Sequence, residues 1–119
     1  MYDGIEYFKD KELECPCCHV LDFSQDLCNM LYQAREVYGK PIVINSGFRC
    51  ITHNTNVGGS PTSSHRRGLA VDIKCTTSTK RFELIEVLIA VGFKRIGIGP
   101  NFIHVDIDES KPQGIIYIK

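Results

Sequence analysis

The chain has 119 residues, of which 43% are hydrophobic and 9% are aromatic. This length can bury one hydrophobic core but is too short for two ordinary domains, so we expect a single domain over residues 1–119. Fourteen basic residues balance fourteen acidic ones, which leaves no overall field to attract nucleic acid or anionic lipid. We expect no nucleic-acid partner, no membrane partner and a monomer.

The sequence also lacks targeting signals. No run approaches the roughly eighteen apolar residues of a membrane span, and the N-terminus lacks the basic and then apolar pattern of a signal peptide. We therefore expect synthesis in the cytoplasm without an export signal. Six cysteines permit disulfides without establishing them, and the missing signal favours mostly reduced thiols. They are Cys15, Cys17, Cys18, Cys28, Cys50 and Cys75.

The first third of the chain predicts an arm, a helix and a strand. Residues 1–22 have little periodicity and are expected to form an N-terminal arm with one helical turn near Lys9 to Leu13. From Ser24, apolar residues recur at spacings of three and four, which predicts a core-facing helix that ends at Gly39. The β-branched run at residues 41–45 predicts a buried strand.

The arm contains a Cys-Pro-Cys-Cys-His cluster, formed by Cys15, Cys17, Cys18 and His19. Thiolates and imidazole bind zinc, so the cluster is a candidate second metal site, although its spacing differs from the usual C-x₂-C pair. The favoured alternative is a set of buried or paired structural cysteines that fastens the arm to the domain. Cys50 is a candidate disulfide partner for Cys17 or Cys18.

Residues 47–68 are rich in Gly, Ser, Thr, Asn and Pro and predict a long irregular loop. Loops of about 20 residues without secondary structure are uncommon in compact domains and are usually functional or disordered. Because this loop contains Arg49, His53 and His65, we expect a functional role.

The remaining pattern predicts a strand at 69–75, a helix at about 79–91, strands at 95–98 and 102–107, and an edge strand in the tail at 114–118. The short connections late in the chain indicate an α+β fold: an antiparallel sheet flanked by helices on one side. The second helix is expected to bury a wide apolar stripe, made of Phe82, Leu84, Ile85, Leu88 and Ile89.

His65, Asp72 and His104 supply the three protein ligands typical of a catalytic zinc site. In a continuous strand, residues seven apart face opposite ways, so His65 must precede the strand, with Gly68 as the break. His104 and Asp106 lie two apart and share a strand face, which brings a second carboxylate beside the metal. By spacing alone, a hydrogen-bonded structural histidine and a turn-capping Asp72 are the alternative.

A longer pattern surrounds these residues. It consists of S-G-F-R at 46–49, H-N at 53–54, G-G at 58–59, S-S-H-R-R-G-L-A-V-D-I at 63–73, G-F at 92–93 and H-V-D at 104–106. In this order the motifs resemble the zinc D-Ala-D-Ala carboxypeptidase family, and within it the short cell-wall peptidases of phages and prophages. The match covers about residues 41–107, and its S-x-H-x-x-G-x-A-x-D element is the most specific part.

The resemblance implies a hedgehog/DD-peptidase-like fold and a zinc-dependent peptidase that hydrolyses a peptidoglycan stem or cross-bridge peptide, as a D,D-carboxypeptidase or an endopeptidase. It further implies action on the bacterial cell wall after release from the cell, or as part of a virion.

The resemblance also implies roles for single residues. His65, Asp72 and His104 match the family's zinc ligands. Arg49 matches an arginine that binds or polarises the substrate near the scissile carbonyl, which a fixed guanidinium can do as an oxyanion develops. Ser63 matches a serine near the substrate backbone. His53 belongs to the matching H-N pair and is a further candidate for substrate binding.

One position departs from the family's pattern. Members commonly carry a Glu three residues before the last zinc histidine, or a His two before it, whereas this chain has Asn101 and Phe102. Asp106 is therefore the expected general base. A side chain from a flexible loop, such as His53 or Asp108, is one alternative. The other is a zinc site with little or no turnover, in which Asp106 only orients the neighbouring histidine.

Two other functions compete with the enzyme. The first is a non-catalytic, zinc-stabilised module of a phage assembly that binds cell-wall peptide without cleaving it. The second is a thiol-based function of the cysteine cluster, which no βαβ pattern supports.

Overall fold

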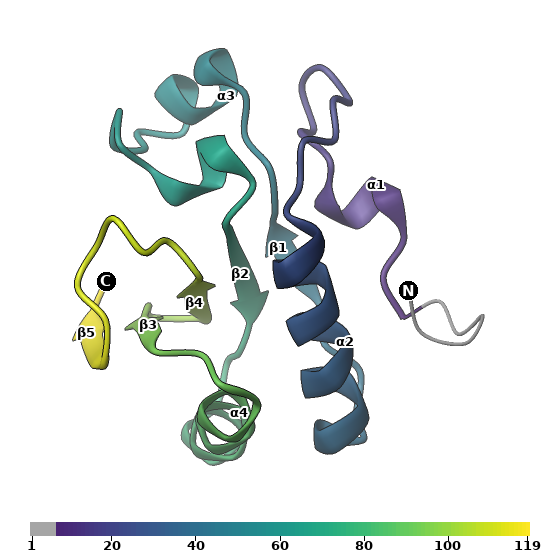
Figure 1. Cartoon of the computed structure of the whole chain (residues 1–119), viewed down its shortest axis with the longest axis vertical. Coiled ribbons are helices and arrows are strands. Elements are labelled where there is room, and N and C mark those ends of the chain that lie inside the picture. Colours follow the sequence, from purple (N-terminus) through teal and green to yellow (C-terminus); the bar gives the residue numbers. More distant parts are fainter. Residues whose placement is uncertain (1–6) are drawn as a thin grey trace.

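The computed structural model describes residues 7–119, so the first six residues of the predicted arm lie outside the described part. The elements follow one another in the order α1 (Asp10–Leu13), α2 (Gln25–Tyr38), β1 (Ile44–Ser46), α3 (Ile51–Asn56), η1 (Ser64–Arg67, a 3₁₀ helix), β2 (Ala70–Lys74), α4 (Ser78–Val91), β3 (Arg95–Ile98), β4 (Phe102–Asp106) and β5 (Ile115–Ile118). The predicted α+β class is confirmed, and Figure 1 shows the arrangement.

The five strands form one sheet in the order β1-β2-β4-β3-β5. The first three neighbouring pairs are antiparallel as predicted, whereas β5 pairs with β3 in parallel. This difference has a simple cause. Both edges of β4 are already paired, so the tail joins the sheet beside β3 instead. Because β5 runs opposite to β4 and β4 runs opposite to β3, the β3-β5 pair is parallel.

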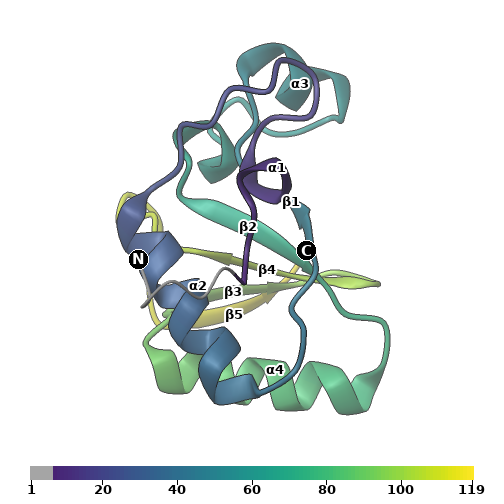
Figure 2. The same ribbon diagram turned by 90° about the vertical axis from the view of Figure 1, so that its right-hand side faces the viewer.

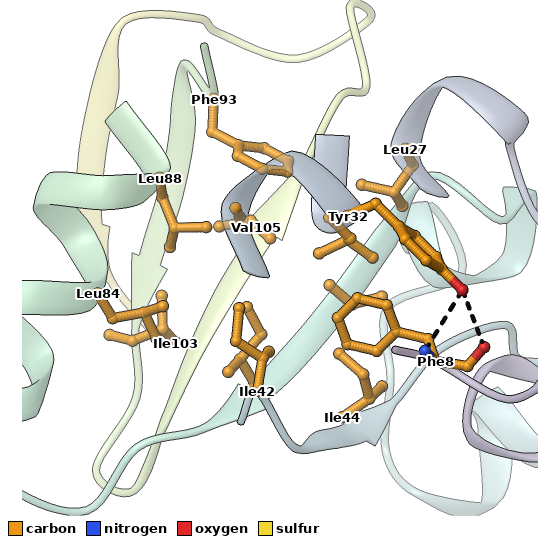
Figure 3. Close-up of a cluster of buried hydrophobic side chains, with 14 of the residues drawn as sticks. Phe8, Leu27, Tyr32, Ile42, Ile44, Leu84, Leu88, Phe93, Ile103 and Val105 are labelled. Carbon is orange, nitrogen blue, oxygen red and sulfur yellow. Dashed lines mark hydrogen bonds between the residues drawn. The ribbon is translucent and has the colours of Figure 1, made fainter. Parts of the chain in front are cut away.

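Helices α2 and α4 cover one face of the sheet. Helix α1 packs beside β1, and α3 lies at the end of the molecule opposite α4 (Figure 2). Alternating strand residues such as Val71, Ile103 and Val105 pack against α2 and α4 and are buried. Leu27 of α2 and Leu88 of α4 lie in the same core (Figure 3). The strand residues between them, including Asp72 and His104, therefore face away from the core.

Both long helices begin and end at the residues that the sequence indicates. The Ser24 side chain accepts a hydrogen bond from the Leu27 backbone N–H at the start of α2, and Gly39 ends that helix with φ 69°. Gly92 ends α4 in the same left-handed region. The helical turn predicted near Lys9 to Leu13 is also present, as α1.

Three predictions of local structure were wrong. The segment 47–68 is not a wholly irregular loop, because α3 and η1 interrupt it; Cys50 and Ser63 cap these helices, which are too short to show periodicity. The strand predicted at 41–45 starts later, because pairing with β2 begins at Ile44. The apolar stripe of α4 is narrower than expected, since Phe82 and Ile89 are 70% and 52% exposed.

No helix within residues 7–119 is both long enough and apolar enough to cross a bilayer.

Candidate active site

A single row of residues crosses the sheet on the face away from the helices. Strand register places Ser46 beside Asp72, Asp72 beside His104, His104 beside Gly97, and Gly97 beside Tyr117. The five strands thus each contribute one residue to the row. Two of its central members are predicted metal ligands.

His65 reaches this row from η1, just before β2. Gly68 ends η1 with φ 67°, and a Cβ at that position would lie 1.9 Å from the carbonyl oxygen of Asp22, so only glycine fits the break. The predicted turn between His65 and the strand is confirmed. The Arg49 backbone N–H donates to the His65 carbonyl at 3.0 Å, which ties η1 to the segment after β1.

The His65 ring is oriented by its second nitrogen. Nδ1 lies 2.8 Å from the carbonyl oxygen of Gly47, and because a carbonyl only accepts, Nδ1 carries the proton. Nε2 therefore has a free lone pair. This atom is buried, lies 3.3 Å from Asp72 Oδ1 and makes no hydrogen bond. A buried polar atom without a partner, aimed at a carboxylate, fits a cation between the two.

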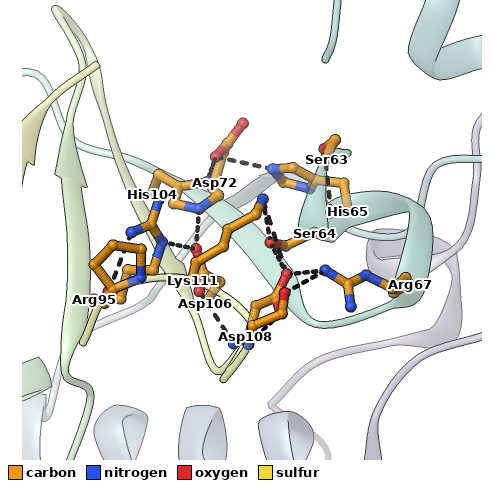
Figure 4. A network of polar contacts seen from close by, with 12 residues as sticks. Ser63, Ser64, His65, Arg67, Asp72, Arg95, His104, Asp106, Asp108 and Lys111 are labelled. Atoms are coloured by element: carbon orange, nitrogen blue, oxygen red, sulfur yellow. Dashed lines mark hydrogen bonds and ion pairs between the residues drawn. The ribbon is translucent and has the colours of Figure 1, made fainter. Parts of the chain in front are cut away.

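His104 completes the set of ligands. Its Nδ1 lies 3.0 Å from Asp72 Oδ1, and one atom each of His65, Asp72 and His104 falls within 4.8 Å of the others. Figure 4 shows the three side chains converging. Two imidazoles and one carboxylate are ligand types typical of a catalytic zinc site. The predicted ligands are thus brought together by η1, β2 and β4.

The electrostatics suit these ligands. Burial lowers the pKa of His65, which favours the neutral imidazole that a metal requires. Burial alone would raise the pKa of Asp72, but the hydrogen bond with His104 and the closeness of both imidazoles hold it well below its usual range. Asp72 is therefore an anion between two histidines.

Arg49 stands beside the three ligands. Its Nε donates to Ser46 Oγ at 3.0 Å, and its two terminal nitrogens contact Asn54 Oδ1 at 3.4 Å and Asp72 Oδ2 at 3.3 Å. The side chain is only 15% exposed. Burial lowers the pKa of Arg49, while the charge of Asp72 opposes that change. The guanidinium is therefore fixed in place next to the three candidate ligands.

Asp106 contacts the far side of the His104 ring. Its Oδ2 lies 2.7 Å from His104 Nε2 and accepts from Arg95 Nε at 3.1 Å, while Oδ1 accepts from the Asp108 backbone N–H. The carboxylate is buried and lies across the ring from Nδ1, the nitrogen that faces Asp72. This position favours an orienting role. The assignment of Asp106 as general base stays a prediction.

Asp108 is held by several partners. Its Oδ2 accepts from Ser64 Oγ at 2.7 Å and pairs with Arg67, and Lys111 Nζ lies 3.8 Å away. Its Oδ1 accepts from Ser110. Burial alone would raise the pKa of Asp108, but these hydrogen bonds and Arg67 lower it to about 2. Such contacts disfavour the idea that this carboxylate swings into the site as a base.

The family model described as Peptidase M15 matches residues 6–106. The chain belongs to the peptidase M15 family. A relative described as a zinc D-Ala-D-Ala carboxypeptidase, from Streptomyces albus G, is 53% identical over 34 residues. That segment covers 29% of this chain and only 13% of the relative's length.

The M15 match includes the three candidate ligands. It also includes two residues predicted to contact substrate, Ser63 and His53, for which no contact with the candidate ligands' side chains is seen in the described residues. Ser63 Oγ accepts from the His65 backbone N–H at 3.2 Å, so it caps η1. His53 lies on α3 and lines a groove of about 160 Å³ together with Ser46 and Gly47. Substrate binding by Ser63 and His53 stays a prediction.

Tyr117 lies beyond the M15 match, and sequence reasoning missed it. Its ring lies over Gly97, where a Cβ would come within 2.8 Å of the ring, and its centroid is 6.3 Å from that of His104. The guanidinium of Arg95 lies over the same Tyr117 ring, 4.7 Å from its centroid. The sequence signal was the alternation in β5, which leaves Ile116 and Ile118 exposed and turns Tyr117 toward the sheet.

Proposed function

We propose that this M15 protein is a zinc-dependent peptidase that hydrolyses peptide bonds of peptidoglycan, as a D,D-carboxypeptidase or an endopeptidase. The observation that supports it most is the convergence of His65, Asp72 and His104 within 4.8 Å, with an unpartnered buried nitrogen on His65. Family membership supports the peptidase chemistry, and the D-Ala-D-Ala carboxypeptidase relative supports the substrate class.

His65 Nε2, a carboxylate oxygen of Asp72 and His104 Nδ1 would hold the zinc. When bound, zinc polarises the scissile carbonyl and lowers the pKa of water toward neutrality. The rest of the site serves to orient groups around these ligands. The Gly47 carbonyl fixes the His65 ring, and Asp106 fixes the His104 ring.

Arg49 supplies a fixed positive charge. Its contacts with Ser46 and Asn54 hold the guanidinium beside Asp72, so no rearrangement is needed when negative charge develops on a substrate oxygen. The same fork can bind a terminal carboxylate through two parallel hydrogen bonds. An arginine in this place suits a peptide substrate. It can bind the terminal carboxylate of the peptide, or stabilise the oxygen of the reacting carbonyl group beside the candidate ligands.

A specific observation favours a second candidate function, in which the chain binds cell-wall peptide without cleaving it. Asn101 and Phe102 occupy the positions where the resembling family carries its base, and neither takes a proton from water. Asp106, the substitute, is already engaged by His104 and Arg95. A zinc-loaded chain that binds peptide but releases no product would identify this function.

The test uses synthetic peptides that end in D-Ala-D-Ala or in L-Ala-L-Ala. The proposed activity predicts release of D-alanine from the first peptide alone, loss of release with EDTA, and recovery on addition of zinc. His65→Ala should be inactive, whereas Lys80→Ala, an exposed change on α4, should match the wild type. If neither peptide is cleaved, digestion of purified peptidoglycan decides between an endopeptidase and no enzyme at all.

A further inference from the structure

A second group of metal-binding side chains lies outside the site described above. Cys15, Cys17 and Cys18 of the arm meet Cys50, which precedes α3, and the four Sγ atoms all lie within 4.8 Å of one another. Cys17 Sγ is 3.2 Å from Cys50 Sγ and 3.5 Å from Cys15 Sγ. None of the four is in a disulfide.

These distances fit four ligands around one ion. With Zn–S bonds of about 2.3 Å, a tetrahedral site separates its sulfurs by about 3.8 Å. A disulfide needs about 2.05 Å and involves only two of the thiols. Four sulfurs that converge on one point, without a pair at bonding distance, therefore match a tetrathiolate site, and a set of four thiolates is typical of zinc or iron.

The local backbone also suits thiolates. A tight turn closes the arm segment: the Cys15 N–H donates to the Val20 carbonyl, the His19 N–H donates to the Cys15 carbonyl, and His19 adopts φ 59°. At the other side, the Cys50 N–H donates to Cys15 Sγ at 3.5 Å, and the His53 N–H donates to Cys50 Sγ at 3.4 Å. Backbone donors of this kind stabilise negative charge on sulfur.

We propose that Cys15, Cys17, Cys18 and Cys50 bind a structural zinc ion, separate from the zinc at His65, Asp72 and His104. All four ligands come from the protein, so the site is closed and does no chemistry on a substrate. Zinc binding releases the protons of the four thiols, and no oxidant or reductant takes part. The site is independent of the proposed peptidase activity.

The ion would connect the arm to the segment that shapes the active site. Cys50 directly follows Arg49 and is the N-cap of α3. The same arm packs against this segment, because the Phe48 N–H donates to the Leu13 carbonyl at 2.8 Å, and a Cβ on Gly47 would come within 2.6 Å of that oxygen. Since Gly47 in turn orients His65, the cysteine site supports the catalytic ligands without touching a substrate.

The test is the zinc content of the full chain, purified with a reductant. We expect two zinc ions per chain in the wild type, one in a Cys17→Ser, Cys50→Ser double variant, and one in a His65→Ala, His104→Ala double variant. Cys75→Ala removes a buried thiol outside the cluster and should keep both ions. Cobalt loaded into the double histidine variant should show thiolate-to-metal charge-transfer absorption, which the serine changes abolish.

Three results would overturn this proposal: one zinc in the wild type that the serine variant retains, iron in place of zinc, or a non-reduced mass that reveals a disulfide between cluster cysteines. If the serine variant does not fold, alkylation of the native wild type decides. The cluster thiols should resist alkylation until a chelator is added. Two bound zinc ions without peptide cleavage would defeat the proposed function and leave this site standing.

Discussion

Among single residues, Asp106 has two candidate roles: it orients His104, or it acts as the general base. If it orients His104, Asp106→Asn should lower zinc affinity at the catalytic site by roughly 10- to 100-fold, and excess zinc should restore most of the activity. If it is the general base, zinc affinity should be unchanged, and kcat should fall by about 10² to 10⁴ even at saturating zinc. Zinc titration followed by rate measurement distinguishes these roles, with exposed Glu109→Gln as the control.

Asp108 gives a prediction about pH. Its pKa is lowered from the usual 3.8 to about 2, so the ionised form stabilises the fold above pH 3.8, and that contribution is lost as the pH falls toward 2. Asp108→Asn should therefore destabilise the protein at neutral pH, by an amount that shrinks over this window. Chemical unfolding of both proteins at several pH values measures the difference. A constant difference down to pH 2 would contradict the assigned contacts with Ser64 and Arg67.

The sequence predicted the residues whose chemistry is specific and missed those that depend on strand register. His65, Asp72 and His104 stand out because their ligand types occur with a glycine break at the required place. Gly97 and Tyr117 join the same row only because β3 and β5 pair in one particular register, which no local pattern encodes. The contact between Arg95 and Asp106 depends on strand pairing in the same way.

At the scale of elements, the break between η1 and β2 is the feature on which the site depends. Gly68→Ala should destabilise the protein, because it adds strain of about 1–3 kcal/mol at positive φ and a collision with the carbonyl of Asp22. Gly39→Ala is a matched control: Gly39 has φ 69° but open space around it.

Thermal unfolding and zinc content should be measured for both glycine variants. Only Gly68→Ala is expected to lose catalytic zinc, since Gly68 determines where His65 points. Equal losses of stability, with zinc retained in both proteins, would show that the glycine break between η1 and β2 does not determine the position of the His65 side chain.

The helix predictions succeeded where a cap and a long apolar repeat coincide, as they do for α2 between Ser24 and Gly39. They failed for α3 and η1, which contain six and four residues and offer no repeat to detect. The pairing of β5 with β3 was equally hidden, because β4 is already paired on both sides and the tail has to reach the β3 edge of the sheet.

At the scale of the whole molecule, the sheet divides two tasks between its faces. One face packs Val71, Ile103 and Val105 against α2 and α4 and supplies hydrophobic stability. The other face presents Asp72 and His104 to the segment that carries His65 and Arg49. The fold class could be predicted from the order of the elements. The approach of Cys50 to the three cysteines of the arm could be seen only in the tertiary structure.

The proposed peptidase activity is tested most directly by measuring zinc content and peptidoglycan hydrolysis on the same preparations of wild type and His104→Ala, with released fragments identified by mass spectrometry. We expect defined peptide-bond cleavage by the wild type, and joint loss of one zinc equivalent and of cleavage in the variant. A wild type with its full zinc content that leaves the peptidoglycan intact would contradict the enzyme and favour the binding module.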